Sequence, residues 1–280
     1  MVEDYRKQSR KRWGSSAGGW EQRADWLRRA TMPVSAWMVD AIAPQPGHTI
    51  LDLAAGLGDT GFLAAELIQP GGTLICSDFA PEMLSAAQRR AEALGIRNVR
   101  FRQIDAEGID QPAASLDGVL CRWGYMLMGD SEAALRETRR VLRPGARVAL
   151  AAWTGAEDNP WGSLPSDQLV ARGLLEDDDP SQPGRWAWAP EGVIGEQLEA
   201  AGFVEHEVVA LDFMIRYPSI EAWWETTAAM SARFAGAAAT LDAAATAELE
   251  AALREQTAAW TADDGSLAMP ARTWVAAATA

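Results

Sequence analysis

The chain has 280 residues, 48% of them hydrophobic, and a formal net charge of −14. This length predicts one compact core with an added cap. The negative charge argues against a nucleic-acid surface, because phosphates are bound by clustered Lys and Arg. No stretch reaches the roughly 18 apolar residues of a membrane span and no secretory leader is visible, so we expect a cytoplasmic protein. The composition leaves the oligomeric state, monomer or homodimer, open.

The cysteines and histidines of the chain do not have the spacing of a metal site or of a disulfide framework. Cys76 and Cys121 fall in apolar runs typical of buried strands, and His48 and His206 stand at predicted strand starts. None of them has metal-ligand spacing, so we predict no metal site. The single basic cluster, residues 6–12, holds both lysines of the chain and is interpreted as a solvated face of an N-terminal helix.

The first 45 residues predict a helical arm. Trp13, Trp20, Trp26 and Trp37 recur there at helix-like spacing. Aromatic residues in such a pattern favour packing against the rest of the fold. A lid over a ligand is a second role that is compatible with this packing.

From residue 48 onward, apolar strand-like runs alternate with helical stretches. Strands alternating with helices of this length indicate βαβ units and a parallel sheet covered on both faces. Ligands bind beyond the carboxyl ends of the strands in such sheets. The expected strands are 48–54, 72–79, 99–105, 116–122 and 147–153, and the expected helices are 59–68, 81–94 and 131–142.

The regular alternation ends after residue 153. Residues 154–190 are rich in Pro, Gly and Asp, which predicts a loop-like cap or a variable surface excursion. The elements expected beyond it are a helix over 191–201, a strand over 204–215, helices over 219–235 and 241–259, and a strand over 272–278.

The most informative segment is the run ILDLAAGLGDTG at residues 50–61. An apolar strand leads through a glycine-rich turn into a helix. Glycine permits backbone conformations and close ligand approaches that a side chain would block. Gly56, Gly58 and Gly61 satisfy G-x-G-x-x-G, and Asp78 follows at the spacing of a ribose-binding acid, a pattern shared with dinucleotide-binding proteins.

Three features argue against a ligand that contains a pyrophosphate. Asp52 closes the first strand, where a carboxylate suits the cationic amine of an amino-acid ligand and would repel a pyrophosphate. Asp105 closes the third strand and is placed to accept a hydrogen bond from an adenine amino group. The run RRVLRPG at 139–145 ends a helix with an abrupt turn into the fifth strand.

With these features the chain resembles the class I S-adenosylmethionine-dependent methyltransferases. Within them it is most similar to the group that includes the ubiquinone and menaquinone C-methyltransferases (methyltransferase type 11). The matching segments are LDLAAGLGDTG at 51–61, SDFAPEML at 77–84, DAEG at 105–108, LDGVLCRWGYMLM at 116–128 and RVLRPGARVALAAW at 140–153.

The resemblance implies a Rossmann-like, doubly wound sheet of seven mostly parallel strands, the last of them antiparallel. It also implies an N-terminal helical arm and inserted cap helices that form the acceptor pocket. The expected organisation is an arm or lid over 1–45 and a methyltransferase domain over 46–280, with cap insertions near 154–190 and 216–264.

The resemblance assigns the residues that bind S-adenosylmethionine and its product S-adenosylhomocysteine. The acid of the first strand lies near the methionine moiety, that of the second accepts the ribose hydroxyls, and that of the third accepts the adenine amino group. The alternative role of Asp52 is capping of the following turn, that of Asp78 is capping of the helix near Pro81, and that of Met83 is packing in the core. The cofactor-binding set is Asp52, Ala54, Gly56, Gly58, Asp78, Phe79, Met83, Asp105, Ala106, Cys121 and Arg122.

One position departs from the family pattern. Ala54 stands where many members have the first glycine of the turn, and the quinone-type members often have alanine there. We interpret Ala54 as a mark of that subgroup.

The acceptor side is predicted to be aromatic. Ring faces hold flat hydrophobic molecules or attract cationic amines, although each ring taken singly is also an ordinary core residue. No catalytic residue is predicted, because both histidines fall outside the crevice. This favours catalysis by positioning, with an Asp, Glu or Tyr base as the alternative. The candidate acceptor-binding residues are Trp20, Trp123, Tyr125, Met126, Trp153, Trp161, Trp186 and Trp224.

The sequence therefore predicts methyl transfer from S-adenosylmethionine to a small, hydrophobic or aromatic acceptor, at carbon or oxygen and less favourably at nitrogen. One alternative is an NAD(P)-dependent oxidoreductase. It would require a Tyr-Lys pair or a hydride-site histidine, whereas lysine occurs only at positions 7 and 11. The other alternative is a non-catalytic cofactor-binding module, which an activity assay separates from the enzyme.

Overall fold

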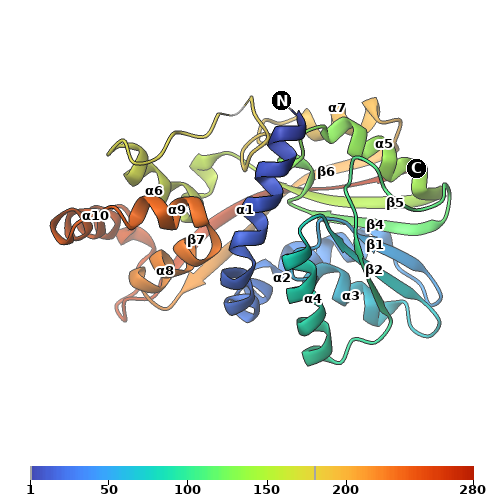
Figure 1. Ribbon diagram of the computed structural model, residues 1–280, viewed down its shortest axis with the longest axis horizontal. Helices are drawn as coiled ribbons and strands as arrows, with labels where there is room; N and C mark the ends of the chain where they lie inside the picture. Colours follow the sequence, from blue (N-terminus) through green and yellow to red (C-terminus); the bar gives the residue numbers. More distant parts are fainter. Residues whose placement is uncertain (1, 180) are drawn as a thin grey trace.

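The computed structural model of the protein describes residues 2–179 and 181–280. Met1, in the expected arm, and Pro180, in the expected insertion, lie outside the described residues. A seven-stranded sheet forms the centre of the described part (Figure 1). Its strands are β1 (Thr49–Asp52), β2 (Thr73–Asp78), β3 (Val99–Gln103), β4 (Leu116–Arg122), β5 (Leu142–Trp153), β6 (Val204–Tyr217) and β7 (Leu267–Thr279).

The strands lie in the order β3-β2-β1-β4-β5-β7-β6. The pairs formed among β1 to β5 are parallel, and β7 runs antiparallel to both β5 and β6. The chain begins in the middle at β1, moves outward to β3 and returns to β4 on the other side of β1. This reversal creates a crevice at the carboxyl ends of β1 and β4, where doubly wound sheets bind ligands. The predicted doubly wound sheet with an antiparallel last strand is confirmed.

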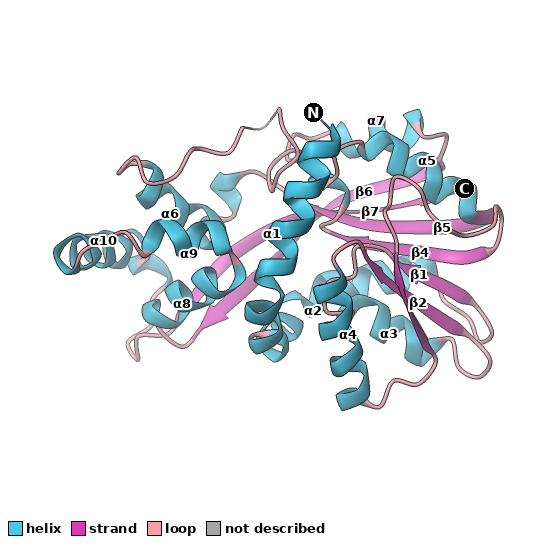
Figure 2. Ribbon diagram, viewed as in Figure 1, coloured by secondary structure: helices cyan, strands magenta, loops and turns pink. Residues whose placement is uncertain are grey.

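Helices cover both faces of the sheet (Figure 2). On one face lie α2 (Ala24–Ile42), α3 (Asp59–Leu67) and α4 (Pro81–Leu94), and on the other lie α5 (Ser131–Val141) and α7 (Val193–Ala200). Strands β1, β2 and β4 are buried almost throughout, as a sheet covered on both faces requires. Within residues 2–179 and 181–280, no helix has the length and apolar character to cross a membrane.

Strands β6 and β7 continue past the carboxyl end of β5. The last residue of β5, Trp153, pairs with Thr273, whereas residues 267–272 of β7 lie beyond β5 and pair with residues 212–217 of β6. This two-stranded ribbon extends from the sheet toward a group of helices at the far end of the molecule (Figure 1). We call these helices the cap; they are α6 (Pro160–Val170), α8 (Ile220–Met230), α9 (Ala232–Ala238) and α10 (Ala243–Gln256). The short 3-10 turns are η1 (Tyr125–Leu127), which follows β4, η2 (Ala156–Asp158) and η3 (Ala258–Trp260).

The N-terminal residues form two helices with different surroundings. Helix α1 (Val2–Gln22) crosses between the sheet and the cap and contacts α4 on one side and α8 on the other (Figure 1). Helix α2 belongs to the core, where Val34 and Met38 have no exposed surface. At Gly19, α1 approaches α8 so closely that a Cβ would overlap the carbonyl oxygen of Ala229. Glycine is therefore required at this crossing.

The structure differs from the sequence prediction mainly in the cap. The segment 154–190, expected to be loop-like, contains α6, and the helix expected over 219–235 is divided into α8 and α9 at Ser231, whose side chain caps α9. Strand β7 begins at Leu267, ahead of the predicted start at 272. The predicted start was wrong because Pro270 is typical of a strand break. A proline is tolerated there because β7 has only β6 as a neighbour at that point.

Candidate functional site

Two buried carboxylates stand at the carboxyl ends of β1 and β2. Asp52 is 1% exposed and accepts a hydrogen bond from the Gly61 amide at 2.8 Å. Asp78 is 6% exposed and accepts from the amides of Gly56 at 3.0 Å and Ala80 at 2.9 Å. Burial raises the pKa of Asp52 to about 7 and the pKa of Asp78 to about 6, although the backbone hydrogen bonds act in the opposite direction. Buried acids of this kind are stabilised in ionised form by a cation or by added hydrogen-bond donors.

The turn between β1 and α3 has the backbone that its glycines predict. Ala54, Gly56 and Gly58 have φ values of 52°, 56° and 83°, in the left-handed region. A Cβ on Gly56 would meet no atom within 4 Å, so the space beside this residue is open. Ala54 adopts the glycine-type conformation, and its methyl group would lie 2.9 Å from a Cβ at Gly124. The alanine at 54 is thus accommodated by a glycine after β4.

Behind the turn lies a network of charges that the sequence did not reveal. Asp59, the first residue of α3, pairs with the Arg90 Nε at 2.8 Å, and both side chains are largely buried. Arg122, at the end of β4, donates to a threonine hydroxyl of α2 and lies 4.8 Å from the ring of Trp123. Its positive charge lowers the pKa of Asp52 against the larger effect of burial. The resemblance placed Arg122 in the cofactor-binding set, and the structure shows that its side chain also contributes to the electrostatics of the site.

The third predicted acid meets helix α1. The Arg6 guanidinium pairs with Asp105 and lies 3.6 Å from the carboxylate of Glu107. The interpretation of residues 6–12 as a solvated face is therefore wrong for Arg6, because two carboxylates beyond β3 hold its charge. No sequence signal identifies this pair, since its members are far apart in the chain.

Helix α1 also covers the residues expected around the adenine ring. Phe79 and Met83 belong to one apolar cluster with Trp20 of α1, whose indole N–H donates to the carbonyl of the last residue of α8 at 3.0 Å. Ala106 and Cys121 are buried, and burial raises the pKa of the Cys121 thiol. The structure thus gathers the predicted cofactor-binding residues at one edge of the sheet, with α1 across it.

Three indole rings form a column from the end of β4 toward the cap. Trp123 stacks on Trp153 with ring centroids 4.1 Å apart and planes 9° from parallel, and Trp153 contacts Trp161 at 4.9 Å. The Trp123 Nε1 donates to the Thr273 hydroxyl at 3.0 Å. With a φ of 57°, Trp123 has a left-handed backbone conformation, which is costly for a bulky residue and is held here by the stack.

The structure does not bring all the predicted acceptor residues together. Tyr125 is 1% exposed and its hydroxyl lies 2.6 Å from that of Thr138 on α5, and Met126 is 3% exposed, so both lie in the core. Trp224 packs edge-on against Phe234 at 4.8 Å within the cap. In the described residues, no group of three or more His, Cys, Asp or Glu side chains is arranged to hold a metal ion.

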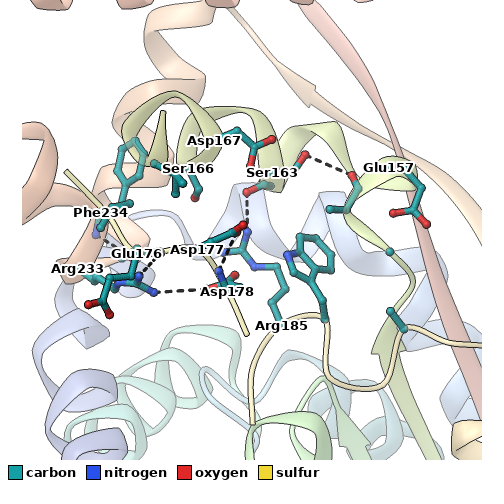
Figure 3. Close-up of a pocket in the computed structure, with 18 of the residues that line it drawn as sticks. Glu157, Ser163, Ser166, Asp167, Glu176, Asp177, Asp178, Arg185, Arg233 and Phe234 are labelled. Atoms are coloured by element: carbon teal, nitrogen blue, oxygen red, sulfur yellow. Dashed lines mark hydrogen bonds and ion pairs between the residues drawn. The ribbon is translucent and has the colours of Figure 1, made fainter. Parts of the chain in front are cut away.

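A cavity of about 470 Å³ is lined by helices α6 and α9 and by the chain segments before and after α6 (Figure 3). Its wall is joined to the carboxyl ends of two strands. Gly155 and Glu157 follow β5 directly, and the Gly184 amide, next to the lining residues Arg185 and Trp186, donates to a carbonyl of η1 at 3.0 Å. Of the predicted acceptor residues, Trp186 lines this cavity.

The fold and this edge together define a class of protein. A doubly wound sheet of this strand order, with acids at the ends of its first two strands and a glycine turn between them, is the arrangement expected of class I S-adenosylmethionine-dependent methyltransferases. Residues 34–156 match the ubiE/COQ5 methyltransferase family. Nocamycin O-methyltransferase from Saccharothrix syringae is 32% identical over 202 residues, which cover 68% of this chain and 71% of that protein. The chain belongs to the S-adenosylmethionine-dependent methyltransferases.

Further relatives agree with this assignment. Demethylmenaquinone methyltransferase from Thermus thermophilus is 39% identical over 125 residues, and the chain spans about half of its length, 52%. The solved structure of the YcgJ protein from Bacillus subtilis shares the fold with a TM-score of 0.56 at 21% identity, covering 88% of this chain and 97% of that one. Geranyl diphosphate methyltransferase in complex with S-adenosylmethionine shares the fold with a TM-score of 0.51 at 19% identity, covering 94% and 91%.

The family membership decides between the alternatives left open by the glycine turn. The protein is a methyltransferase and its cofactor is S-adenosylmethionine, as predicted. The nicotinamide-dependent oxidoreductase and the non-catalytic module are set aside.

Proposed function

We propose that the chain transfers the methyl group of S-adenosylmethionine to a small acceptor bound between the carboxyl edge of the sheet and the cap. One observation carries this assignment of the site: two buried carboxylates, Asp52 and Asp78, flank a glycine turn with open space beside Gly56. The residues present suit this cofactor, because Asp52 has no cationic side chain in direct contact among the described residues and its pKa is raised by burial. A cationic amino group supplies what such a carboxylate lacks.

In this proposal the acids of the edge bind three parts of the cofactor. Asp52 pairs with the amino group of the methionine moiety, and Asp78 accepts the ribose hydroxyls. Asp105 exchanges its contact with Arg6 for the adenine amino group. The apolar wall of the adenine site and the backbone near the sulfur come from the remaining residues, which are Ala54, Gly56, Gly58, Phe79, Met83, Ala106, Cys121 and Arg122.

The catalytic contribution of the chain is positioning and exclusion of water. When bound, S-adenosylmethionine supplies an electrophilic methyl group on a cationic sulfur. The chain must hold the nucleophile in line with the breaking bond at roughly 3–3.5 Å. Neither histidine serves as a base in this proposal: the His48 Nδ1 accepts from the Gln45 amide, and His206 lies 3.9 Å from Glu199 near α7.

We further propose that residues 1–45 act as an arm with α1 as the lid, and that residues 46–280 form the catalytic domain. In this arrangement the segments near 154–190 and 216–264 form the acceptor side. Helix α1 supports a lid role because it bridges α4 and α8 across the edge. The cytoplasmic location stays a prediction from the sequence.

The acceptor is proposed to be a small hydrophobic or aromatic molecule methylated at oxygen or carbon. The names of the relatives, an O-methyltransferase and a demethylmenaquinone methyltransferase, support these two atoms. The indole column from Trp123 to Trp161 supports a flat apolar acceptor. Trp186 and Trp224 remain in the proposed acceptor side, whereas Tyr125 and Met126 serve the core.

The test is isothermal titration with S-adenosylhomocysteine, and with NAD as a negative control. Asp78→Asn should weaken S-adenosylhomocysteine binding about tenfold or more, since hydrogen bonds to a charged group contribute roughly 1.5–3 kcal/mol. Asp242→Asn is the matched control, because Asp242 likewise accepts from a backbone amide, at 2.8 Å, but caps α10 in the cap. Unchanged binding by a folded Asp78→Asn protein would remove Asp78 from the site.

A further inference from the structure

Arg185 is a half-buried cation on the wall of the cap cavity. Its Nη1 donates to the Gly162 carbonyl at 2.7 Å, and the guanidinium lies 5.7 Å from the ring of Trp161 and 5.4 Å from that of Trp186. Among the described residues it has no carboxylate within ion-pair distance, and its Nε and Nη2 have no hydrogen-bond partner. Figure 3 shows the guanidinium among the lining residues. Arg185 therefore presents unused donors to the cavity.

Tyr217 stands in the same aromatic surroundings. It is 3% exposed, and within the described part of the chain its hydroxyl has no hydrogen-bond partner. Its ring lies 5.1 Å from Trp26 and 6.3 Å from Trp223, and the Trp223 indole N–H donates to the Trp161 carbonyl at 2.9 Å. Burial raises the pKa of the Tyr217 phenol, and the charge of nearby Arg185 acts against this rise. The hydroxyl is not sealed off from solvent, so its O–H is available to water or to a bound molecule.

The cavity also has carboxylates, and these are more exposed than Arg185. Glu157, Asp167 and residues 176–178 are exposed, which screens their charges in part, although the charge of Asp178 still acts on Arg185. Arg233, also exposed, is balanced by Asp178 at 3.4 Å. Arg185 is the half-buried charge of this lining, next to indole rings. The inner wall of the cavity therefore offers hydrogen-bond donors, and the rim offers acceptors.

We propose that Arg185, with the nearby Tyr217 as a second donor, binds an anionic oxygen of the methyl acceptor, while the Trp186 indole, which lines the cavity, holds its flat apolar body. The inference rests on the proposed methyl transfer and names its substrate class: aromatic or enolic molecules with an acidic oxygen. Guanidinium and phenol groups are both donors, and their hydrogen bonds to an anion are strong away from water. Arginine stacked on aromatic rings is well suited to such recognition.

In this proposal Arg185 and Tyr217 determine which acceptor binds, and they lie apart from the cofactor-binding acids. The indole column, Trp123, Trp153 and Trp161, joins Arg185 to the end of β4. An acceptor anchored at Arg185 therefore lies against the column, which leads toward the edge where the cofactor is proposed to bind. Neither residue is required for cofactor binding, so the two sites can be tested separately.

The experiment titrates the full chain, saturated with S-adenosylhomocysteine, with flat probes that differ in charge. The probes are 2-naphthoate, neutral naphthalene-2-carboxamide and cationic 2-naphthylmethylammonium, followed by calorimetry and tryptophan fluorescence. We expect 2-naphthoate to bind at least about tenfold more tightly than the ammonium probe. 4-Nitrophenolate in mildly alkaline buffer is a fourth probe. Tighter binding of 4-nitrophenolate than of 2-naphthoate indicates a phenolate or enolate acceptor, and weaker binding indicates a carboxylate acceptor.

Variants of single residues test which side chains account for the tight binding of 2-naphthoate. Arg185→Met should weaken 2-naphthoate binding about tenfold to a hundredfold and leave the carboxamide unchanged. Arg185→Lys should restore part of the affinity, because it keeps the charge and loses the planar fork. Tyr217→Phe should weaken 2-naphthoate by a smaller factor. Arg136→Met, at an exposed arginine of α5, is the matched control and should leave all probes unchanged.

Two results would overturn the inference. One is tighter binding of the ammonium probe than of 2-naphthoate, which would assign the cavity to amines. The other is unchanged 2-naphthoate binding by a folded Arg185→Met protein that still binds S-adenosylhomocysteine. A wild-type chain that fails to bind S-adenosylhomocysteine contradicts the proposed function instead, and titration of the probes without it still tests the cavity.

Discussion

Cofactor binding should be coupled to proton release from Asp52 and Asp78. Burial raises their pKa values in the folded chain to about 7 and about 6. The proposed function requires both as carboxylates, since one meets an ammonium group and the other accepts two hydroxyls. The bound state therefore favours the ionised forms, and the affinity for S-adenosylhomocysteine should rise with pH through these two values.

The magnitude follows from the two pKa values. If binding requires both groups ionised, each protonated group multiplies the apparent Kd by its own factor. With pKa values of about 7 and about 6, the apparent Kd at pH 6 is roughly twentyfold larger than at pH 8. That ratio corresponds to about 1.8 kcal/mol. At pH 5 the ratio grows to roughly a thousandfold.

The assay is calorimetric titration with S-adenosylhomocysteine between pH 5 and pH 8, in two buffers of different ionisation enthalpy. The difference in heat between the buffers counts the protons released. Asp52→Asn should remove the dependence near pH 7 and leave the one near pH 6. An affinity that stays constant over this range, with no buffer-dependent heat, would refute the assignment of these carboxylates to the cofactor site.

Unfolding of the cofactor-free chain provides a control of opposite sign. Both folded pKa values lie above the unfolded value of about 3.9 for aspartate. The folded chain therefore holds protons that the unfolded chain has lost between about pH 4 and pH 7. The contribution of these two groups to stability is complete below the unfolded pKa and is lost as the pH rises through the folded values. Acid should thus weaken cofactor binding while it favours the folded state at these two groups.

Two further predictions concern the surroundings of the site. Gly19→Ala should lower the free energy of unfolding, measured in urea, by about 1–3 kcal/mol and expose α1 to proteolysis, because its Cβ would overlap a carbonyl of α8. Gly18→Ala is the control, because a Cβ there meets no atom within 4 Å, and it should raise the free energy of unfolding by about 0.5–1 kcal/mol. Equal effects of the two would argue against close packing of α1. Arg90→Met should cost about 3–5 kcal/mol, because it leaves the buried Asp59 carboxylate without its ion-pair partner. Exposed Arg89→Met should leave the urea midpoint nearly unchanged, and an equal loss in both variants would contradict the buried-pair argument.

The parts of the fold that the sequence predicts well depend on local signals. Helix α4 was predicted with its bounds at Pro81 and Leu94 because proline suits the first turn of a helix, and the structure has a left-handed glycine directly after Leu94. Strand β4 was predicted as 116–122 because its residues form one buried apolar run. The acids Asp52 and Asp78 are local features too, since each closes a strand. Parallel pairing of β1 and β2 then brings them to the same edge.

The parts that the sequence does not predict depend on packing between distant segments. Arg6 meets Asp105 only because α1 crosses the edge of the sheet. Arg185 and Tyr217 lie on segments far apart in the chain, and contacts of Trp161 with Arg185 and of Trp223 with Tyr217 link them. No spacing within the chain encodes these meetings. The left-handed Trp123 is equally hidden, since its conformation is fixed by its stack on Trp153.

The two sides of the site offer opposite charges to their ligands. In the arrangement we propose, the sheet edge presents carboxylates, which favour a cationic methyl donor, and the cap cavity presents Arg185, with Tyr217 nearby, which favours an anionic acceptor. Transfer of a methyl group from a sulfonium to an anion removes both charges in one step, as the new bond takes its electrons from the anion and the broken bond returns its electrons to sulfur. Water stabilises separated ions more than a transition state in which the charges cancel. In the proposed arrangement, a site that draws these ions together between α1, the indole column and the cap lowers the barrier by positioning, and the reaction does not require a general base.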